Sequence, residues 1–215
     1  MFEVSERSFY RRHNLMLKKK LWLYSLLLAT MVFTCSASPA KLSHYFQESW
    51  TTRDGLPHNT INSITQSEDG YLWLATWEGA ARFNGREFEV FGRGPLTGLP
   101  DSGVRVLNTD HAGNLLLAGA RGGVSKRTAN GWHSWPQFNV LLNAVAEDEQ
   151  SNLWLASEGQ GLFVQKPDGS RQQFTQAQGL NSDVVHSLLL DTAGKLWIGT
   201  GRGLVWLDTR APTAQ

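Results

Sequence analysis

Short alternations of apolar and polar residues, separated by turn residues, fill the chain from about residue 60 onward. In the first unit, residues 60–65, 71–76, 79–83 and 87–91 each have the length and pattern of a β-strand. Asn84-Gly85 between the last two is a strong hairpin signal, because both residues tolerate positive φ. Helical periodicity is not evident beyond the N-terminal segment. The pattern therefore predicts an all-β fold.

One phrase recurs four times, and its clearest copy is Asp-Thr-Ala-Gly-Lys-Leu-Trp-Ile-Gly-Thr at residues 191–200. A large apolar residue holds the same place in every copy, at intervals of 43, 38 and 43 residues: Trp73, Leu116, Trp154 and Trp197. This period is typical of four-stranded β-propeller blades. A blade cannot bury its faces alone, so we expect these four anchors to fill the gaps between blades. Leu116 is the weakest anchor, and Ser151 replaces the turn glycine of the third copy.

We therefore predict a β-propeller of about four four-stranded blades, either a small ring or part of a larger one. Residues 41–92 are assigned to a closing strand plus blade one, 93–135 to blade two and 136–175 to blade three. Residues 176–209 form an incomplete blade four, and 210–215 a polar tail. Residues 45–50 have the pattern of an outermost strand placed before the first blade. That strand could close a four-bladed ring, but truncation of a longer ring is the favoured interpretation.

The first forty residues have the order of a secretory signal. Basic residues precede an uncharged apolar run at 21–33, and small residues follow it. This run is short for a helix that spans about 30 Å of hydrocarbon. We predict a cleaved signal peptide with a signal helix, or alternatively an uncleaved anchor. The protein is then periplasmic, or anchored in the inner membrane with its propeller in the periplasm, and touches the membrane only through this segment.

Composition narrows the functions that the chain can have. The formal net charge is +1, which gives no electrostatic footprint for nucleic acid. The single cysteine, Cys35, lies in the predicted signal, so the mature chain would hold no disulfide or cysteine–zinc site. The histidines lack a close metal-ligand spacing, and neither a nucleophile elbow nor a phosphate loop occurs. We expect no cofactor and no metal.

The lead-in Asp-Gly-Leu-Pro-His-Asn-Thr-Ile-Asn-Ser-Ile at residues 54–64 completes a recognisable pattern with the segments at 69–76 and 82–85. Together they resemble the two-component regulator propeller repeat, as do residues 178–183 and 191–204. The resemblance covers about residues 44–209. It implies the extracytoplasmic ligand-sensing region of bacterial hybrid histidine kinases and diguanylate cyclases. Members continue with a small β-sandwich, a membrane helix and a cytoplasmic output module.

This sequence departs from that plan, because it ends at Gln215 with no second apolar segment. Any kinase or cyclase activity would belong to a missing or separate module, so the chain is not predicted to be an enzyme. A downstream signalling module or a partner receptor is the expected protein partner. The expected ligand is an unidentified small molecule or glycan.

Candidate ligand residues lie in the loops that share one face of a propeller. The connections between second and third strands carry Trp77, Glu78, Arg121, Glu158 and Arg202. The connections into each first strand carry His58, Asn59 and Asn181, with Arg105 near the start of its strand. Mixed aromatic, charged and amide groups suit a polar or sugar-like ligand, and Trp77 is the best single candidate. The alternative is a solvated loop face, where Asn59 and Asn181 only organise turns.

Two other functions stay open. A glycan-active propeller enzyme would need paired acids, and Glu78 and Glu158 occupy equivalent loops, but two blades apart. A retaining mechanism requires carboxyl groups about 5–5.5 Å apart, which that placement makes doubtful. A resemblance of residues 67–73 to a sialidase Asp-box fails on its glycine spacing. The other function is a protein-interaction scaffold, which open blade edges would permit.

Overall fold

The computed structural model describes residues 45–92, 98–99 and 101–210. The chain divides into two units, residues 1–48 and 49–215. Residues 45–48 are the described part of the first unit, and they form neither helix nor strand. The predicted signal segment (1–40) and residues 211–215 of the predicted tail lie outside the described residues. Within the described part of the chain, no helix has the length and apolar character that crossing a membrane requires.

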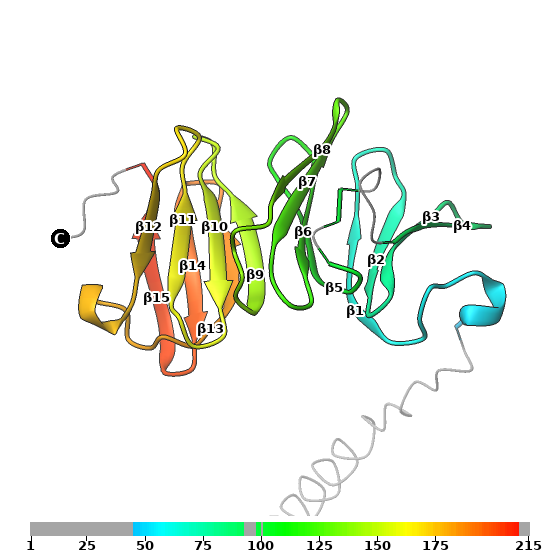
Figure 1. Ribbon diagram of the computed structural model, residues 1–215, viewed down its shortest axis with the longest axis horizontal. Coiled ribbons are helices and arrows are strands. Elements are labelled where there is room, and N and C mark those ends of the chain that lie inside the picture. The colour runs from blue at the N-terminus through cyan, green and yellow to red at the C-terminus, as the bar shows by residue number, and fades with distance from the viewer. Residues whose placement is uncertain (1–44, 93–97, 100, 211–215) are drawn as a thin grey trace, which may run out of the picture. The chain divides into compact units, whose positions relative to one another are not determined.

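The second unit consists of antiparallel sheets, each made of strands consecutive in the chain (Figure 1). The first sheet contains β1 (Ile61–Gln66), β2 (Leu72–Thr76), β3 (Gly79–Phe83) and β4 (Phe88–Phe91). The second contains β5 (Val104–Thr109), β6 (Leu115–Gly119), β7 (Val124–Thr128) and β8 (Gly131–Trp135). The third contains β9 (Leu142–Glu147), β10 (Leu153–Ser157), β11 (Leu162–Gln165) and β12 (Arg171–Phe174).

The fourth sheet has three strands among the described residues: β13 (Val185–Leu190), β14 (Lys195–Thr200) and β15 (Gly203–Asp208). The first strands of the sheets contact one another in chain order, β1 with β5, β5 with β9 and β9 with β13. The prediction of an all-β fold built from short antiparallel units is therefore confirmed. The four strands predicted for the first unit match β1–β4 to within one residue at each end.

Residues 45–50, which were predicted to form a closing strand, do not form a strand. The intended partner of that strand would be β15 in the fourth sheet. Trp50 instead packs edge-on against Phe83 of β3, with 5.0 Å between the ring centroids. The apolar end of this segment therefore packs on the first sheet.

Two short 3-10 helices were not predicted from the sequence: η2 (Thr52–Asp54) and η3 (Gln176–Gln178). Each precedes the first strand of a sheet, β1 or β13. Each begins with a threonine capping box, from Thr51 to Asp54 and from Thr175 to Gln178. Each ends at a glycine with positive φ. Three residues are too few to produce helical periodicity, so only the caps could have indicated these turns.

The sheets are held together by three apolar contacts, one between each pair of neighbours. Trp73 lies in the first contact, Leu116 in the second and Trp154 in the third, and all three side chains are almost completely buried. Burying a large side chain stabilises a fold by about 1.5–3 kcal/mol. Trp197, the fourth anchor, is only partly buried. The core therefore lies between sheets and is repeated along the chain.

A carboxylate in the preceding turn fixes the anchor in the third and fourth sheets. The Asp148 Oδ2 atom accepts a hydrogen bond from Trp154 Nε1 at 2.8 Å, and Asp191 Oδ2 accepts one from Trp197 Nε1 at 2.9 Å. The other oxygen of each carboxylate accepts backbone N–H groups of the turn itself. One aspartate thus couples the turn conformation to the position of the indole.

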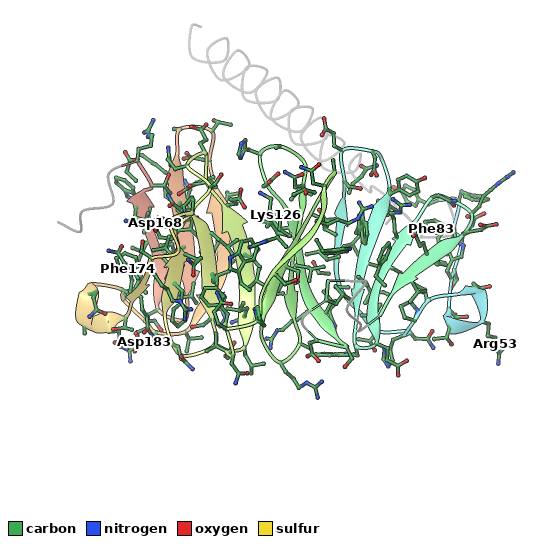
Figure 2. The ribbon with its side chains drawn as sticks, turned by 45° about the horizontal axis from the view of Figure 1, so that its top comes forward. Arg53, Phe83, Lys126, Asp168, Phe174 and Asp183 are labelled. Carbon is green, nitrogen blue, oxygen red and sulfur yellow. The ribbon has the colours of Figure 1, made fainter. Side chains whose placement is uncertain are left out.

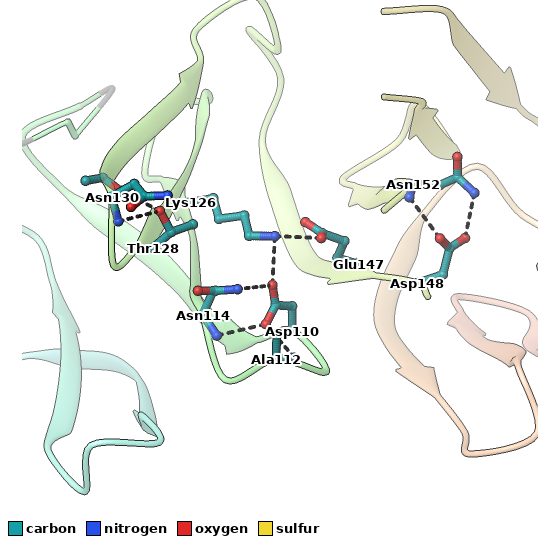
Figure 3. Close-up of polar contacts among 10 residues, drawn as sticks. Asp110, Ala112, Asn114, Lys126, Thr128, Asn130, Glu147, Asp148 and Asn152 are labelled. Carbon is teal, nitrogen blue, oxygen red and sulfur yellow. Dashed lines mark hydrogen bonds and ion pairs between the residues drawn. The ribbon is translucent and has the colours of Figure 1, made fainter. Parts of the chain in front are cut away.

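In the second sheet the turn aspartate cannot bind an indole, because the anchor is Leu116 and its side chain has no N–H group to donate. The Lys126 ammonium lies 2.7 Å from Asp110 Oδ2 and 2.6 Å from Glu147 Oε1 of the third sheet (Figure 3). Figure 2 shows the Lys126 side chain between these two sheets. Both carboxylates are almost fully buried. Lys126 therefore replaces the missing indole donor and also links two neighbouring sheets.

The charges of this cluster are mutually stabilised. Burial alone would raise the pKa of Asp110, but hydrogen bonds from Lys126 and Asn114 hold that pKa below its ordinary value. Burial alone would lower the pKa of Lys126, but its bonds to Asp110 and Glu147 raise that pKa. The ionised forms of both groups are thus favoured in the folded protein.

We expect Lys126→Met to lower the free energy of unfolding by about 3–5 kcal/mol, because it leaves two buried carboxylates without their cation. Urea titration at neutral pH measures this change. Lys166→Met is the matched control, because Lys166 is partly exposed and forms no ion pair among the described residues. Equal losses in the two variants would contradict the role given to Lys126.

The stability difference between the wild type and Lys126→Met should depend on pH. The lowered pKa of Asp110 stabilises the fold above its ordinary value of 3.8, and this contribution is lost as pH falls through the folded value. The raised pKa of Lys126 stabilises the fold below 10.5, and that contribution is lost as pH rises through the folded value. The difference should therefore be widest between these limits and narrow on both sides. A difference that is constant with pH would argue against the ion pairs.

The turn before β10 stores a small strain that a substitution can release. Ser151 has φ 60°, whereas glycines occupy the equivalent turns, such as Gly70 at φ 84°. A left-handed conformation costs an L-residue about 1–2 kcal/mol, part of which glycine loses again through chain entropy. We expect Ser151→Gly to stabilise the protein by about 0.5–1 kcal/mol, and Gly70→Ser to destabilise it similarly, in urea titrations. Shifts of the same sign in both variants would contradict this account.

Candidate functional site

We call the first strand of each sheet its inner strand. In each inner strand the pairing register with the next strand shifts once, at the strand's second residue. The pairing register shifts across Asn62 in β1, Arg105 in β5 and His186 in β13. It shifts across Asn143 in β9 in the same way. A β-bulge adds a residue that the partner strand does not pair, and it re-aims that side chain. The fold therefore presents one polar side chain per sheet at equivalent positions.

These four bulged residues line one cleft of about 520 Å³. The second-to-third-strand connections of the first and third sheets add Trp77 and Glu158, and Val106 completes the lining. Clefts of this size are typical of small-molecule sites. The cleft thus collects residues from all four sheets.

A chain of hydrogen bonds fixes the middle of the cleft. Arg105 Nη2 donates to Asn143 Oδ1 at 2.8 Å, and Asn143 Nδ2 donates to Glu158 Oε2 at 2.6 Å. The same Asn143 amide nitrogen donates to the Val185 carbonyl at 2.9 Å, and Asn62 Nδ2 donates to the Val104 carbonyl at 2.8 Å. The two amides therefore tie each sheet to the next, and Asn143 also orients a cation and a carboxylate.

The chemistry of this lining is mixed. Arg105 supplies guanidinium donors, Glu158 carboxylate acceptors and His186 an imidazole. Trp77 keeps 46 % of its surface exposed, so an aromatic face is available at the rim. One cation beside one carboxylate gives little net charge. The arrangement can hydrogen-bond hydroxyl and carbonyl groups and stack against an apolar ring face.

The residues predicted for the site divide into two groups. Trp77, Glu158 and Arg105 are brought together in the cleft. Glu78 follows Trp77 but is not part of the lining, and its backbone N–H donates to Thr76 Oγ1. Arg121 lies elsewhere and forms a bidentate pair with Asp101, at 2.6 Å between Nη2 and Oδ1 and 3.3 Å between Nε and Oδ2.

The Arg121 pair affects the carboxyl group that it contacts. Burial alone would raise the pKa of Asp101, yet hydrogen bonds from Arg121 and from backbone N–H groups hold that pKa below its ordinary value. The Arg121 guanidinium is thus already engaged in organising the β6–β7 turn. It is not among the residues that line the cleft.

The remaining predicted residues also organise local turns. His58 Nδ1 accepts the Thr60 N–H at 2.9 Å, and Asn59 Oδ1 accepts the Thr52 N–H at 2.8 Å. Asn181 Oδ1 accepts the Thr200 hydroxyl, and its amide nitrogen donates to the Arg202 carbonyl. Arg202 itself donates to Gln176 Oε1 at 3.2 Å. These contacts fix the loops around the cleft, and none of these four side chains lines it.

Sequence reasoning missed Asn62, Asn143 and His186 as site residues. A usable signal existed, because each lies between two residues of its inner strand at the same position of the repeat. What the sequence did not indicate is the bulge that turns this position toward the cleft. Among the described residues, no group of three or more potential metal ligands occurs.

Comparison with known proteins identifies the repeated unit. The family model of the two component regulator propeller matches residues 55–78 and 179–202. Two segments of the chain are thus similar to the two component regulator propeller repeat. Each matched segment includes one of the bulged cleft residues, Asn62 in the first and His186 in the second. No curated protein matches the sequence.

Solved extracellular domains of bacterial proteins are similar to the chain in structure. The extracellular domain of BT4673 from B. thetaiotaomicron is 21 % identical with a TM-score of 0.62, covering 77 % of this chain and 23 % of that one. That of BT3049 from the same organism is 20 % identical with a TM-score of 0.55, covering 70 % and 20 %. This chain thus spans about a fifth to a quarter of their lengths. The predicted propeller fold is confirmed.

The fold is also found in enzymes. Virginiamycin B lyase from Staphylococcus aureus is 14 % identical with a TM-score of 0.51, and the match covers 74 % of this chain and 58 % of that one. At this level of identity the similarity shows the fold alone. The repeats therefore establish the architecture, and the function must be argued from the cleft.

Proposed function

We propose that the chain is the ligand-sensing propeller region of an exported bacterial signalling receptor, and that it binds a small sugar-like ligand in the cleft at the inner strands. The observation that carries the proposal is the convergence of one bulged polar residue from each of four successive sheets: Asn62, Arg105, Asn143 and His186. Packing alone does not require a polar residue at this position in every repeat.

The lining matches the chemistry of carbohydrates. Sugar hydroxyl groups both donate and accept hydrogen bonds, which suits Arg105 as donor, Glu158 as acceptor and His186 as either. The exposed indole of Trp77 offers an apolar face for the C–H side of a sugar ring. Asn143 holds Arg105 and Glu158 in place before any ligand arrives. Such preorganisation lowers the entropy lost on binding.

The receptor context is supported by three observations. Two segments of the chain are similar to the two component regulator propeller repeat. The extracellular domains of BT4673 and BT3049, to which the chain is similar in structure, are described as parts of hybrid two component systems. The N-terminal sequence has the order of an export signal. In this proposal the propeller lies outside the cytoplasm, and kinase or cyclase output belongs to another module or a partner receptor.

Binding is favoured over glycan cleavage by the acids at the cleft. Glycoside hydrolases use two carboxyl groups, either about 5–5.5 Å or about 6.5–9.5 Å apart. Among the described residues that line the cleft, Glu158 is the one carboxylate. Glu78, the second acid considered from the sequence, is not part of the lining. The cleft is therefore better suited to hold a glycan than to hydrolyse it.

We expect at least one member of a panel of neutral and uronic-acid oligosaccharides to raise the melting temperature, as preferential binding to the folded state requires. Arg105→Ala and Trp77→Ala should each weaken that binding about tenfold or more in calorimetric titrations, which corresponds to about 1.4 kcal/mol. Arg86→Ala, in the exposed β3–β4 hairpin, and Glu78→Gln, beside the cleft, are the matched controls.

Three outcomes would contradict the proposal. No stabilisation by any sugar of the panel would rule out the ligand class. Unchanged affinity in both cleft variants would rule out the site. Release of shortened oligosaccharides during incubation, lost in Glu158→Gln, would show an enzyme instead of a sensor.

A further inference from the structure

The contact between the second and third sheets leaves a second cavity, of about 350 Å³, apart from the cleft described above. One wall of this cavity comes from β8 and the residues after it, with His133, Trp135 and Gln137. The other wall comes from the third sheet, and the β11–β12 hairpin forms part of the rim. The cavity and the cleft share no lining residue. Its volume lies within the range of small-molecule sites.

A row of four residues crosses the wall that the third sheet provides. The strand register places Leu153 opposite both Glu147 and Gln165, and Gln165 opposite Arg171. All four of these residues line the cavity. In the fourth sheet the same row holds three leucines: Leu190, Leu196 and Leu207. Packing between sheets therefore does not require polar residues in this row.

The contact between the first and second sheets shows how the same space is filled elsewhere. In the second sheet Trp132 holds the place that Arg171 has in the third. The Trp132 ring centroid lies 6.5 Å from that of Trp73 and 6.1 Å from that of Phe91. In the contact between the second and third sheets, the anchor is Leu116 and the indole of Trp132 is replaced by a guanidinium. Two large rings are therefore missing there, which accounts for the cavity.

The cavity carries an excess of positive charge. Arg171 and Lys166 both line it, and neither forms an ion pair among the described residues. Among the described residues that line the cavity, Glu147 is the one carboxylate, and the Lys126 ammonium neutralises it at 2.6 Å (Figure 3). Asp168 of the hairpin is not part of the lining, and its carboxylate accepts a backbone N–H of its own turn. Two cations are therefore available to an anionic group.

The position of Arg171 suits the recognition of an oxyanion. Its Cζ atom lies 4.5 Å from the centroid of the Phe138 ring. The N–H groups of a guanidinium lie in its plane and match the two oxygens of a carboxylate or phosphate. Gln165 Nε2 donates to the carbonyl groups of Lys166 and Ser170, at 3.1 Å and 3.2 Å. The hairpin that carries both cations is thus fixed by a buried amide of the cavity wall.

Trp135 gives the cavity an apolar surface. Its indole is partly buried and packs against the core between the second and third sheets. The His133 ring contacts it edge-on, with 4.3 Å between the ring centroids. Leu153 adds an aliphatic surface to the lining. The cavity therefore combines two cations that have no carboxylate partner with surfaces that can contact an apolar ring.

We propose that this cavity is a second ligand site, which binds a small organic anion. Arg171 and Lys166 hold the carboxylate or phosphate group of the ligand, and its flat apolar part lies against Trp135. This inference does not depend on the proposed sugar ligand, because the cavity and the cleft are lined by different residues.

Titration of the full chain with benzoate, phenyl phosphate and inorganic phosphate, at constant ionic strength, tests the ligand class. Benzoate or phenyl phosphate should shift the indole N–H resonance of Trp135 saturably, and this resonance is assigned by its loss in Trp135→Phe. The ring-bearing anion that binds should do so more tightly than inorganic phosphate. Benzamide, the neutral counterpart of benzoate, should bind about tenfold or more weakly, because it lacks the charge. No saturable shift with either aromatic anion, or equal affinity for benzamide, would overturn the proposal.

Variants of the two cations test the site. Arg171→Gln and Lys166→Gln should each weaken binding of the aromatic anion about tenfold or more, because each removes a charged hydrogen-bond donor. Arg86→Ala is the matched control, because Arg86 is an exposed arginine in the β3–β4 hairpin. Unchanged affinity in both glutamine variants would rule out this cavity. A loss of anion binding in Arg105→Ala instead would place the anion in the cleft.

A variant that fills the cavity gives a test in a folded protein. Arg171→Trp copies the residue that the second sheet has at this place, Trp132. The indole should occupy the cavity and abolish binding of the aromatic anion, while the melting temperature stays the same or rises. An Arg171→Trp variant that keeps the wild-type affinity would refute the site, and one that loses both affinity and thermal stability would contradict the account of the cavity.

Discussion

The structure depends on one constraint, which is that no single sheet of this protein can bury its own faces. Trp73, Leu116 and Trp154 become buried only because the next sheet lies against them. The stabilising contacts therefore lie between repeats, and each repeat is stabilised by its neighbours. Asp148 serves the third contact by binding the Trp154 indole, and Lys126 serves the second by binding the turn residue Asp110.

The candidate site is a consequence of how the sheets are held. The inner strands are kept side by side by the contacts further out, and a bulge at their second residue turns one side chain toward the cleft. Asn62 and Asn143 then donate hydrogen bonds to carbonyl groups of the next inner strand. Two residues that line the cleft therefore also connect neighbouring sheets, and this bracing holds the cleft in shape. In the proposed function, this bracing leaves Arg105, His186 and the loop residues to contact the ligand.

Much of the fold could be predicted from the sequence, because the signals are local or repeated. The alternation of residues 87–91 and the Asn84-Gly85 turn give β3–β4, and the period of the anchors gives the blades. The site was predicted only in part. Trp77 and Glu158 were found by their place in the repeat, but the bulges depend on pairing between strands, which a single strand does not reveal. The pairing of Arg121 with Asp101 was not predicted, because nothing local shows that this partner lies twenty residues away.

The two kinds of repeated position differ in how freely they can change. The anchor position must fill a fixed volume between two sheets, and three of its four residues are tryptophan. The exception, Leu116, is accompanied by a lysine that restores the missing donor. The bulged position faces a cleft instead of a packed layer, and its four residues are asparagine, arginine, asparagine and histidine. Substitution there leaves the apolar contacts between sheets intact and changes only the hydrogen bonds that the bulged residues make to neighbouring inner strands. A fold of this kind can therefore vary the residues at its cleft while it keeps the apolar contacts that hold its sheets together, as the proposed sensing function would require.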